Sequence, residues 1–184
     1  HLMKTDINFK SYGGEHGIII TPSTWLNPKN PLDYDDVLKC SDCHGVTIDA
    51  ITIQGGRENC FDAVRGSNYL LQNVKLCPNG SGGIVFKGAI DGWALDNLYF
   101  HAHGKSSDIE IGQFSKWWQP GDPPTRKGLI RWVTSNDGKP VEVWLWDAEM
   151  PQITQSNVRV HRVPWIVWFP YFLWRYFWTM RNWA

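Results

Sequence analysis

A pattern of apolar residues recurs every 23 or 24 positions between residues 45 and 101. Three segments, 45–54, 68–77 and 92–101, align without a gap, and apolar side chains fill four shared columns. The columns are Val46, Tyr69 and Trp93; Ile48, Leu71 and Leu95; Ile51, Val74 and Leu98; and Ile53, Leu76 and Phe100. A unit of this length cannot bury its apolar side alone, whereas stacked copies bury it against their neighbours. The repeat therefore predicts a β-solenoid, and we call one repeat unit a coil.

Short segments with strand character lie between the aligned ones. Residues 59–65, 83–87 and 108–111 alternate apolar and polar side chains with the period of two that a strand requires. Leu38 and Cys40 fit the same columns one coil earlier. Each coil is therefore expected to carry two or three short strands, with regular coils from about Leu38 to Ile111.

A sandwich of β-hairpins is the alternative to a solenoid. Hairpins need tight turns between paired strands, and the Asn-Gly pair at 79–80 supplies a suitable sequence. The solenoid is favoured because Asn73 and Asn97 share one column between apolar flanks, with Ala50 one coil earlier. Stacked amides in such a column can bond to each other as a ladder. Asn157 is expected to continue this column in a later coil.

The stretch from Gly45 to Leu76, above all residues 53–68, resembles coils of the pectate-lyase-like superfamily of right-handed parallel β-helices. That superfamily includes polysaccharide lyases and the β-helices of phage tailspikes and other virion proteins. The resemblance covers roughly 80 residues and is one of fold pattern, without an active-site signature. It implies an all-β fold, a right-handed parallel β-helix of few coils, with a role in carbohydrate handling or in a virion.

The length, charge and N-terminal sequence of the chain indicate its domains, its partners and its location. Its 184 residues suffice for one hydrophobic core, so we expect a β-helix domain over 1–162 and an aromatic tail over 163–184. Eighteen basic and eighteen acidic residues cancel, so nothing in the overall charge favours nucleic acid as a partner. No apolar stretch follows the first four residues. We therefore expect no secretory signal and a cytoplasmic location on synthesis, followed by assembly into a virion or onto a surface.

The resemblance to polysaccharide lyases raises the question of whether the outward columns could support catalysis. Lyases of the superfamily bind Ca²⁺ through aspartates and remove a sugar proton with a Lys or Arg. Asp62 and Glu110 share an outward column, but Val85 separates them, which places the carboxylates roughly 10 Å apart. That spacing is too wide for one ion without other ligands, although it suits an inverting carboxylate pair. We expect an ordinary surface of ion pairs, with Ca²⁺ only if the protein is a lyase. The candidate catalytic face consists of Glu58, Asp62, Arg65 and Lys87.

His101 and His103 are weak candidates for metal ligands. On a strand both imidazoles would lie on one face, near Asp108 and Glu110. The Gly-Lys-Ser-Ser run at 104–107 follows at once and favours a turn instead. We therefore expect no metal site.

The four cysteines are candidates for zinc ligands or for disulfides. Cys40 and Cys43 have the spacing of half a zinc site, but the second half would be Cys60 and Cys77, which are seventeen residues apart. The column of Cys40 also contains Ala63, so its sulfur is expected in the core. We expect free, buried thiols.

Residues 113–124 interrupt the repeat with three prolines and a glycine, which predicts a loop. Trp117 and Trp118 in this loop, together with Tyr99, are candidates for glycan binding, because an aromatic face covers the apolar face of a sugar ring. The alternative is that the two tryptophans cover the flank of the solenoid. Beyond the loop, residues 141–147 alternate as a further strand, with a turn at 136–138 before it.

The C-terminal tail is unusually aromatic, with five of the twelve tryptophans in the last twenty residues. A spanning helix needs about 20 apolar residues, and Pro170 and Arg175 make this stretch marginal. Its composition suits a cap on the last coil, an interface between subunits, or an interfacial membrane anchor. The residues expected to make these contacts are Trp165, Trp168, Phe172, Trp174 and Trp178.

Three functions are compatible with these features. The first is a non-catalytic β-helix protein of a virion or cell surface, structural or glycan-binding, and a homo-oligomer, with a trimer as one option, through its aromatic tail. The second is a small polysaccharide lyase or hydrolase that acts on an acidic glycan. The third is a membrane-attached assembly protein. The short solenoid and the lack of a compact carboxylate cluster favour the first.

Overall fold

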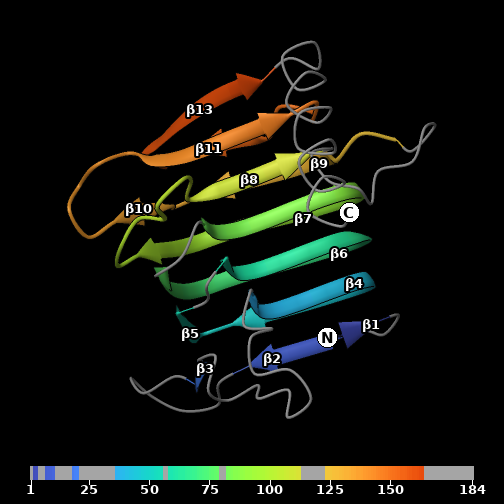
Figure 1. Cartoon of the computed structure of the whole chain (residues 1–184), viewed down its shortest axis with the longest axis horizontal. Helices are drawn as coiled ribbons and strands as arrows, with labels where there is room; N and C mark the ends of the chain where they lie inside the picture. The colour runs from blue at the N-terminus through green and yellow to red at the C-terminus, as the bar shows by residue number, and fades with distance from the viewer. Residues whose placement is uncertain are drawn as a thin grey trace, which may run out of the picture.

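The computed structural model describes residues 2–3, 7–10, 18–20, 36–55, 58–78, 82–112 and 123–163. In this part of the chain all regular structure is β, without helices, and thirteen strands form one sheet (Figure 1). The strands are β1 (Leu2–Met3), β2 (Ile7–Lys10), β3 (Ile18–Ile20), β4 (Asp36–Asp49), β5 (Ile51–Gly55), β6 (Asn59–Pro78), β7 (Gly82–Phe100), β8 (Ile109–Gly112), β9 (Arg126–Arg131), β10 (Thr134–Ser135), β11 (Val141–Trp146), β12 (Gln152–Thr154) and β13 (Val158–Val163).

Every pairing between these strands is parallel, and each coil passes along three sides. Along one side the order of neighbours is β1-β4-β6-β7-β8-β11-β13, so consecutive coils stack in sequence order. Parallel pairing of consecutive segments cannot arise from hairpins. The hairpin alternative is therefore wrong for the described residues. Side A holds residues 36–41, 59–64, 82–87, 109–112, 141–146 and 158–163; side B holds 46–49, 69–72, 93–96, 128–131 and 152–154; side C holds 51–55, 74–78, 98–100 and 134–135.

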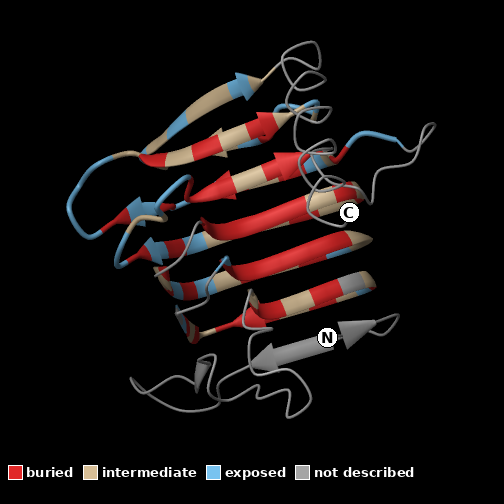
Figure 2. Cartoon of the chain, in the orientation of Figure 1, coloured by how far each residue is buried: buried red, intermediate tan, exposed pale blue. Residues whose placement is uncertain are grey.

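The strand register confirms the columns predicted from the repeat. Val46 pairs with Tyr69 and Tyr69 with Trp93, and Leu76 pairs with Phe100. The side chains of these columns fill the interior of the stack, where most are less than 4% exposed (Figure 2). The predicted strand at 141–147 is also confirmed, as β11. Apolar burial along the repeat thus positions every surface residue discussed below.

Each coil turns at corners where the backbone is left-handed. Between sides B and C the same corner recurs in five coils with φ between 51° and 57°. Asparagine adopts this conformation more readily than most L residues, whereas a bulky side chain there is unusual. The corner positions are Ala50, Asn73, Asn97, Trp132 and Gln155.

Two asparagines of this corner form the predicted amide ladder. Asn97 Nδ2 donates to Asn73 Oδ1 at 2.7 Å, and Asn73 Nδ2 donates to Asp49 Oδ1 at 2.8 Å. The ladder therefore ends on Asp49, because the methyl group of Ala50 has no acceptor. The expectation that Asn157 continues the column is wrong, because Gln155 occupies that corner and the backbone N–H of Asn157 donates to Val133 O.

Replacing Asn97 with alanine is expected to lower the free energy of unfolding by about 1 kcal/mol, because a hydrogen bond is lost and alanine is less stable in the left-handed conformation. Asn97→Gly is the control, since glycine tolerates the conformation but lacks the amide. Urea unfolding of both variants separates the two contributions. Equal stability of wild type and Asn97→Ala would rule out a stabilising ladder.

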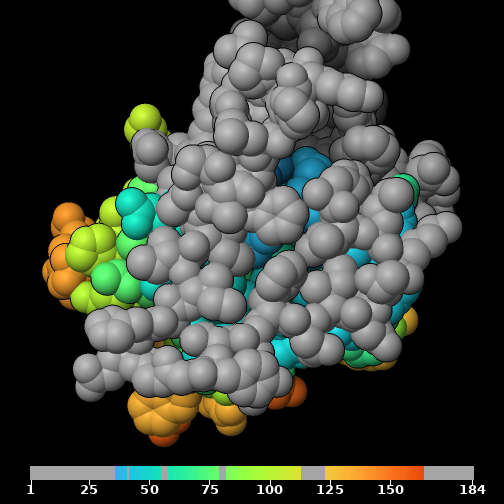
Figure 3. Space-filling model, turned by 90° about the horizontal axis from the view of Figure 1, so that it is seen from below, coloured from blue at the N-terminus to red at the C-terminus, as the bar shows by residue number. Residues whose placement is uncertain are grey.

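The turn at residues 136–140 projects from the side of the stack. It is the orange loop at the left of Figure 1, and orange atoms stand at the left margin of the view along the stack in Figure 3. The turn joins β10 to β11 and confirms the turn predicted at 136–138. It lies beside the last residues of β7, because the backbone N–H of Asn136 donates to Phe100 O at 2.8 Å.

Candidate functional site

The predicted catalytic face is partly assembled, on the outer surface of side A. Asp62 Oδ2 lies 2.7 Å from Lys39 Nζ and 2.8 Å from Lys87 Nζ, and Lys39 Nζ also lies 2.9 Å from Asp36 Oδ2. Asn59 Nδ2 donates to Asp36 Oδ1 at 2.7 Å. Two carboxylates and two ammonium groups thus form one compact cluster across β4, β6 and β7.

The Asp62 carboxylate is buried, with none of its side chain exposed. Desolvation by burial and the charge of Asp36 raise its pKa to about 6, against the opposing effect of Lys87 and Lys39. Neighbouring outward residues of the same side, Val64 and Val85, are buried too. The outer surface of side A is therefore not the solvated row of ion pairs expected from the sequence, and Asp62 is shielded from water.

Arg65 pairs with a carboxylate other than the two of this cluster. Arg65 Nε donates to Asp42 Oδ1 at 2.7 Å and its Nη2 donates to Asp42 Oδ2 at 2.8 Å, which binds the guanidinium to a corner between sides A and B. Glu58 is exposed before the start of β6. The structure thus brings together Asp62 and Lys87, and the catalytic role proposed for the four residues stays a prediction.

His103, one of the two weak metal candidates, lies between two carboxylates. His103 Nδ1 is 2.7 Å from Asp108 Oδ2, and His103 Nε2 is 3.0 Å from Asp137 Oδ1. His101 is exposed, and both histidines lie in the turn that the sequence favoured, not in a strand. Within the described ranges, no group of three or more His, Cys, Asp or Glu side chains is arranged to hold a metal ion.

A group of aromatic rings lies on the outer surface of side A, on β11 and β13. Trp144 stacks on His161 with ring centroids 4.5 Å apart, and on Trp146 at 6.2 Å. Glu142 bonds to His161 and lies 3.1 Å from Arg159 Nη1. Trp144, Trp146 and His161 thus form one group of near-parallel rings, with the Glu142–Arg159 ion pair beside it.

Exposed aromatic side chains gather where side B meets side C. Tyr99 and Trp132 are 38% and 48% exposed, and only Met150 is another large apolar side chain so exposed among the described residues. Thr134 pairs with Tyr99, and Trp132 precedes Thr134 by two residues. The two rings therefore belong to neighbouring coils, whose paired strands are about 4.8 Å apart. This surface, which we call the aromatic corner, consists of Asn97, Tyr99, Trp132, Thr134 and Asn136.

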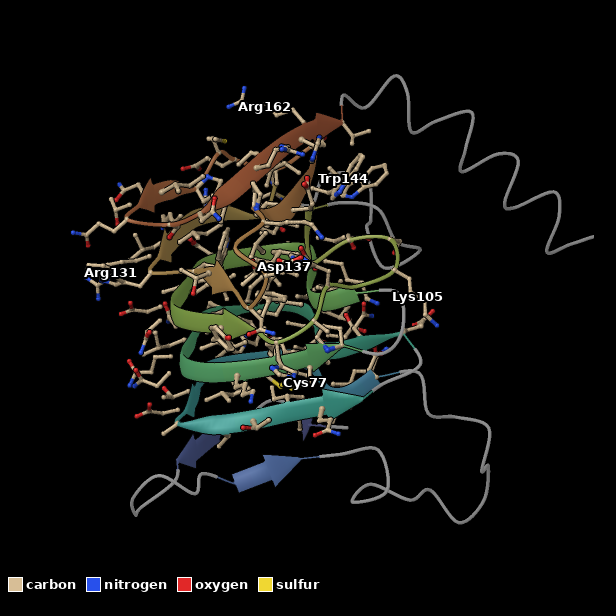
Figure 4. The ribbon with its side chains drawn as sticks, turned by 90° about the vertical axis from the view of Figure 1, so that its left-hand side faces the viewer. Cys77, Lys105, Arg131, Asp137, Trp144 and Arg162 are labelled. Carbon is tan, nitrogen blue, oxygen red and sulfur yellow. The ribbon has the colours of Figure 1, made fainter. Side chains whose placement is uncertain are left out.

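The polar groups of the aromatic corner are exposed and ordered by hydrogen bonds. The Tyr99 hydroxyl donates to Asn136 Oδ1 at 2.6 Å. Arg131, beside the corner, has its Nε 3.0 Å from Asp96 Oδ1. Figure 4 faces side C, with Asp137 of the neighbouring turn near the centre and Arg131 at one edge. Amides, a hydroxyl and two aromatic rings thus share one solvent-facing surface.

Trp132 was missed by the sequence analysis, although Tyr99 was a candidate. The place of Trp132 in the asparagine column comes from the strand register, in which Gly128 to Arg131 pair with Trp93 to Asp96. The offset there is 35 residues rather than 23 or 24, because residues 113–122 are inserted between the coils. A search for repeats of 23 or 24 residues therefore does not find that Trp132 belongs to this column.

The four cysteines are free thiols, as predicted, and Cys40, Cys43 and Cys60 are buried. Cys77 is only partly buried, so the expectation of burial is wrong for this residue. Cys40 is 1% exposed and lies in the inward column with Ala63. Burial raises the pKa of Cys60 to about 12, so this thiol is protonated at neutral pH and unsuited to a nucleophilic role.

Several predicted contact residues fall outside the described part of the chain. They are the glycan candidates Trp117 and Trp118 and the tail residues Trp165, Trp168, Phe172, Trp174 and Trp178. The described residues contain no helix long and apolar enough to cross a membrane.

Comparisons with protein-family models, with curated proteins and with solved structures each found no match. Functional conclusions therefore depend on the side chains and their geometry.

Proposed function

We propose that the chain is a right-handed parallel β-helix that acts as a non-catalytic glycan-binding protein, and that the aromatic corner is its binding surface. The single observation that supports this most is the pair of exposed rings, Tyr99 and Trp132, on neighbouring coils of one corner. Parallel pairing in sequence order along three sides supports the β-helix.

The chemistry of the corner suits a sugar. An aromatic face covers the apolar C–H face of a pyranose and removes both from water. The amides of Asn97 and Asn136 and the hydroxyl of Thr134 supply donors and acceptors at the rim, where sugar hydroxyls need them. Exposed Lys75, which pairs with Tyr99 in the register, adds a positive charge at this surface.

The carboxylates beside the corner support binding without catalysis. Asp96 is paired with Arg131, and Asp137 is paired with Lys139 at 2.7 Å and with His103. A glycoside hydrolase needs one carboxyl group that donates a proton and one carboxylate that activates water or attacks the sugar. Side chains held in ion pairs are poorly placed for either role.

The test is a titration of the full chain with a panel of neutral and acidic oligosaccharides. We expect binding of at least one of them, and Tyr99→Ala should weaken it about 5-fold because one stacking surface is lost. Met150→Ala is the matched control, since Met150 is equally exposed but lies between β11 and β12, away from the corner. Absence of binding to the whole panel would refute the proposed function, and equal losses in the two variants would refute the site.

We also propose that this β-helix is a homo-oligomer of a virion or a cell surface, with the aromatic tail as its interface. Solenoids must protect their terminal coil from edge-to-edge association, and the last described strand, β13, pairs with β11 along one edge only among the described residues. Light scattering coupled to size exclusion, on the full chain and on a chain that ends at residue 163, tests this. A monomeric full chain would contradict it.

A further inference from the structure

One histidine joins two loops of the molecule through both of its ring nitrogens. His103 belongs to the loop between β7 and β8, and it contacts Asp108 at 2.7 Å and Asp137 at 3.0 Å. Asp137 belongs to the turn between β10 and β11, 34 residues later in the chain. His103 is thus a bridge between the 101–107 loop and the 136–140 turn.

The two carboxylates are held to different degrees. Asp108 is 2% exposed, and besides His103 it accepts hydrogen bonds from the backbone N–H groups of Gly104 and Glu142, both at 2.9 Å. Asp137 is 39% exposed and depends on its own turn, through the backbone N–H of Lys139 and the Ser135 hydroxyl. Asp108 is therefore the fixed end of the bridge, and Asp137 is the end that can move.

Asp137, at one end of the bridge, is adjacent in sequence to Asn136 of the aromatic corner. Asn136 precedes Asp137, and Asn136 Oδ1 accepts the hydrogen bond from the Tyr99 hydroxyl at 2.6 Å. The backbone of Asn136 is anchored to β7 through its bond to Phe100 O, so the rest of the 136–140 turn acts on the orientation of the Asn136 side chain and of the Tyr99 hydroxyl. A change at His103 is therefore transmitted to the proposed glycan site.

Only one protonation state of His103 satisfies both carboxylates. The imidazolium donates from both nitrogens, whereas the neutral ring donates from one and directs a lone pair from the other. Facing a carboxylate, that lone pair repels it. We infer that His103 is a pH-sensitive clasp, which holds the 136–140 turn in place when protonated and loosens it when neutral, and thereby regulates glycan affinity at the aromatic corner. This regulation rests on the proposed function of that corner.

The charges around the imidazole agree with such a clasp. Burial opposes the protonated form, but the hydrogen bonds and charges of Asp108 and Asp137 outweigh it and raise the pKa of His103. Two lysines lie in the loops around His103 that the structure describes. Lys139 pairs with Asp137, and Lys105 belongs to the 101–107 loop. A raised folded-state pKa means that stabilisation by the clasp is complete below the unfolded value of about 6.5 and is lost as pH rises through the folded value.

The experiment measures oligosaccharide affinity between about pH 5.5 and pH 9 for wild type, His103→Gln and His101→Gln. His101→Gln is the matched control, since His101 is two residues away and exposed. We expect the dissociation constant of wild type and of His101→Gln to rise about 5-fold with pH, and that of His103→Gln to stay flat. The same pH dependence in His103→Gln would overturn the clasp.

A second readout separates the clasp from glycan binding. The His103 ring resonances should titrate together with the side-chain amide of Asn136 in the unliganded protein. This joint titration should vanish in Asp137→Asn, which removes the charge but keeps an oxygen that can accept the bond from the Lys139 backbone N–H. If the wild type binds no oligosaccharide at any pH, the proposed function fails. If it binds with a pH dependence that His103→Gln retains, only the clasp fails.

Discussion

Replacing Trp132 with asparagine is expected to weaken glycan binding about 20-fold and, at the same time, to raise the free energy of unfolding by about 1 kcal/mol. The loss in affinity follows from removal of the most exposed large ring of the aromatic corner, which is 48% exposed. A substitution that raises the free energy of unfolding while it weakens binding identifies a residue that is present for its function.

The expected gain in stability comes from the column to which Trp132 belongs. Its φ of 57° matches that of Asn73 and Asn97. An asparagine at 132 relieves the unfavourable left-handed conformation of a bulky residue and places a donor next to Asn97 Oδ1, which extends the ladder by one coil.

Titration with the oligosaccharide and urea unfolding of the same preparation check this prediction. Trp132→Phe is the control, because it keeps an aromatic face in the same conformation and should retain most of the affinity. Unchanged affinity of Trp132→Asn would exclude Trp132 from the site. A fall in its stability would show that the corner geometry favours tryptophan for structural reasons.

Replacing Lys87 with methionine is expected to lower the free energy of unfolding by about 3 kcal/mol at pH 8. Lys87 is 13% exposed and lies 2.8 Å from Asp62, which is fully buried. Methionine fills a similar volume, so the expected loss is electrostatic. It comes from the buried Asp62 carboxylate, which keeps its ion pair with Lys39 but loses the one with Lys87.

This deficit should shrink as the pH falls. The pKa of Asp62 is already raised to about 6, and removal of a cation raises it further. A carboxyl group whose folded pKa exceeds its unfolded value of about 3.9 binds more protons when folded, so its contribution to stability falls as pH rises between the two values. The difference between Lys87→Met and wild type should therefore be large at pH 8 and nearly absent near pH 4.

The double variant Asp62→Asn with Lys87→Met serves as the control. It replaces the charged pair with neutral groups of similar shape, and it should recover most of the lost stability at pH 8, since neutral replacements of buried ion pairs are well tolerated. Chemical unfolding at several pH values measures all three proteins. A deficit in Lys87→Met that is equal at every pH would point to lost packing instead of charge.

The sequence by itself determined the part of the molecule in which the repeat is regular. Between Leu38 and Ile111 the apolar columns are set by a period of two along each strand and by one repeat per coil, and both follow from burial of one face. The pairing of Ile48 with Leu71 and of Phe61 with Ile84 is therefore readable from the spacing alone. Asp62 was correctly placed in its column by the same means.

Only the tertiary structure showed which residues meet where neighbouring coils differ in length. Residues 113–122 interrupt the repeat, so the alignment of Trp132 with Asn97 follows from the strand register and not from spacing. The contact of His103 with Asp137 joins two loops, and it too is visible only in the structure. The burial of Asp62 also escaped the sequence, because an outward position in a strand does not reveal what covers it. Local periodicity fixes which side chains point inward, whereas the partners of outward side chains are chosen by segments distant in the chain.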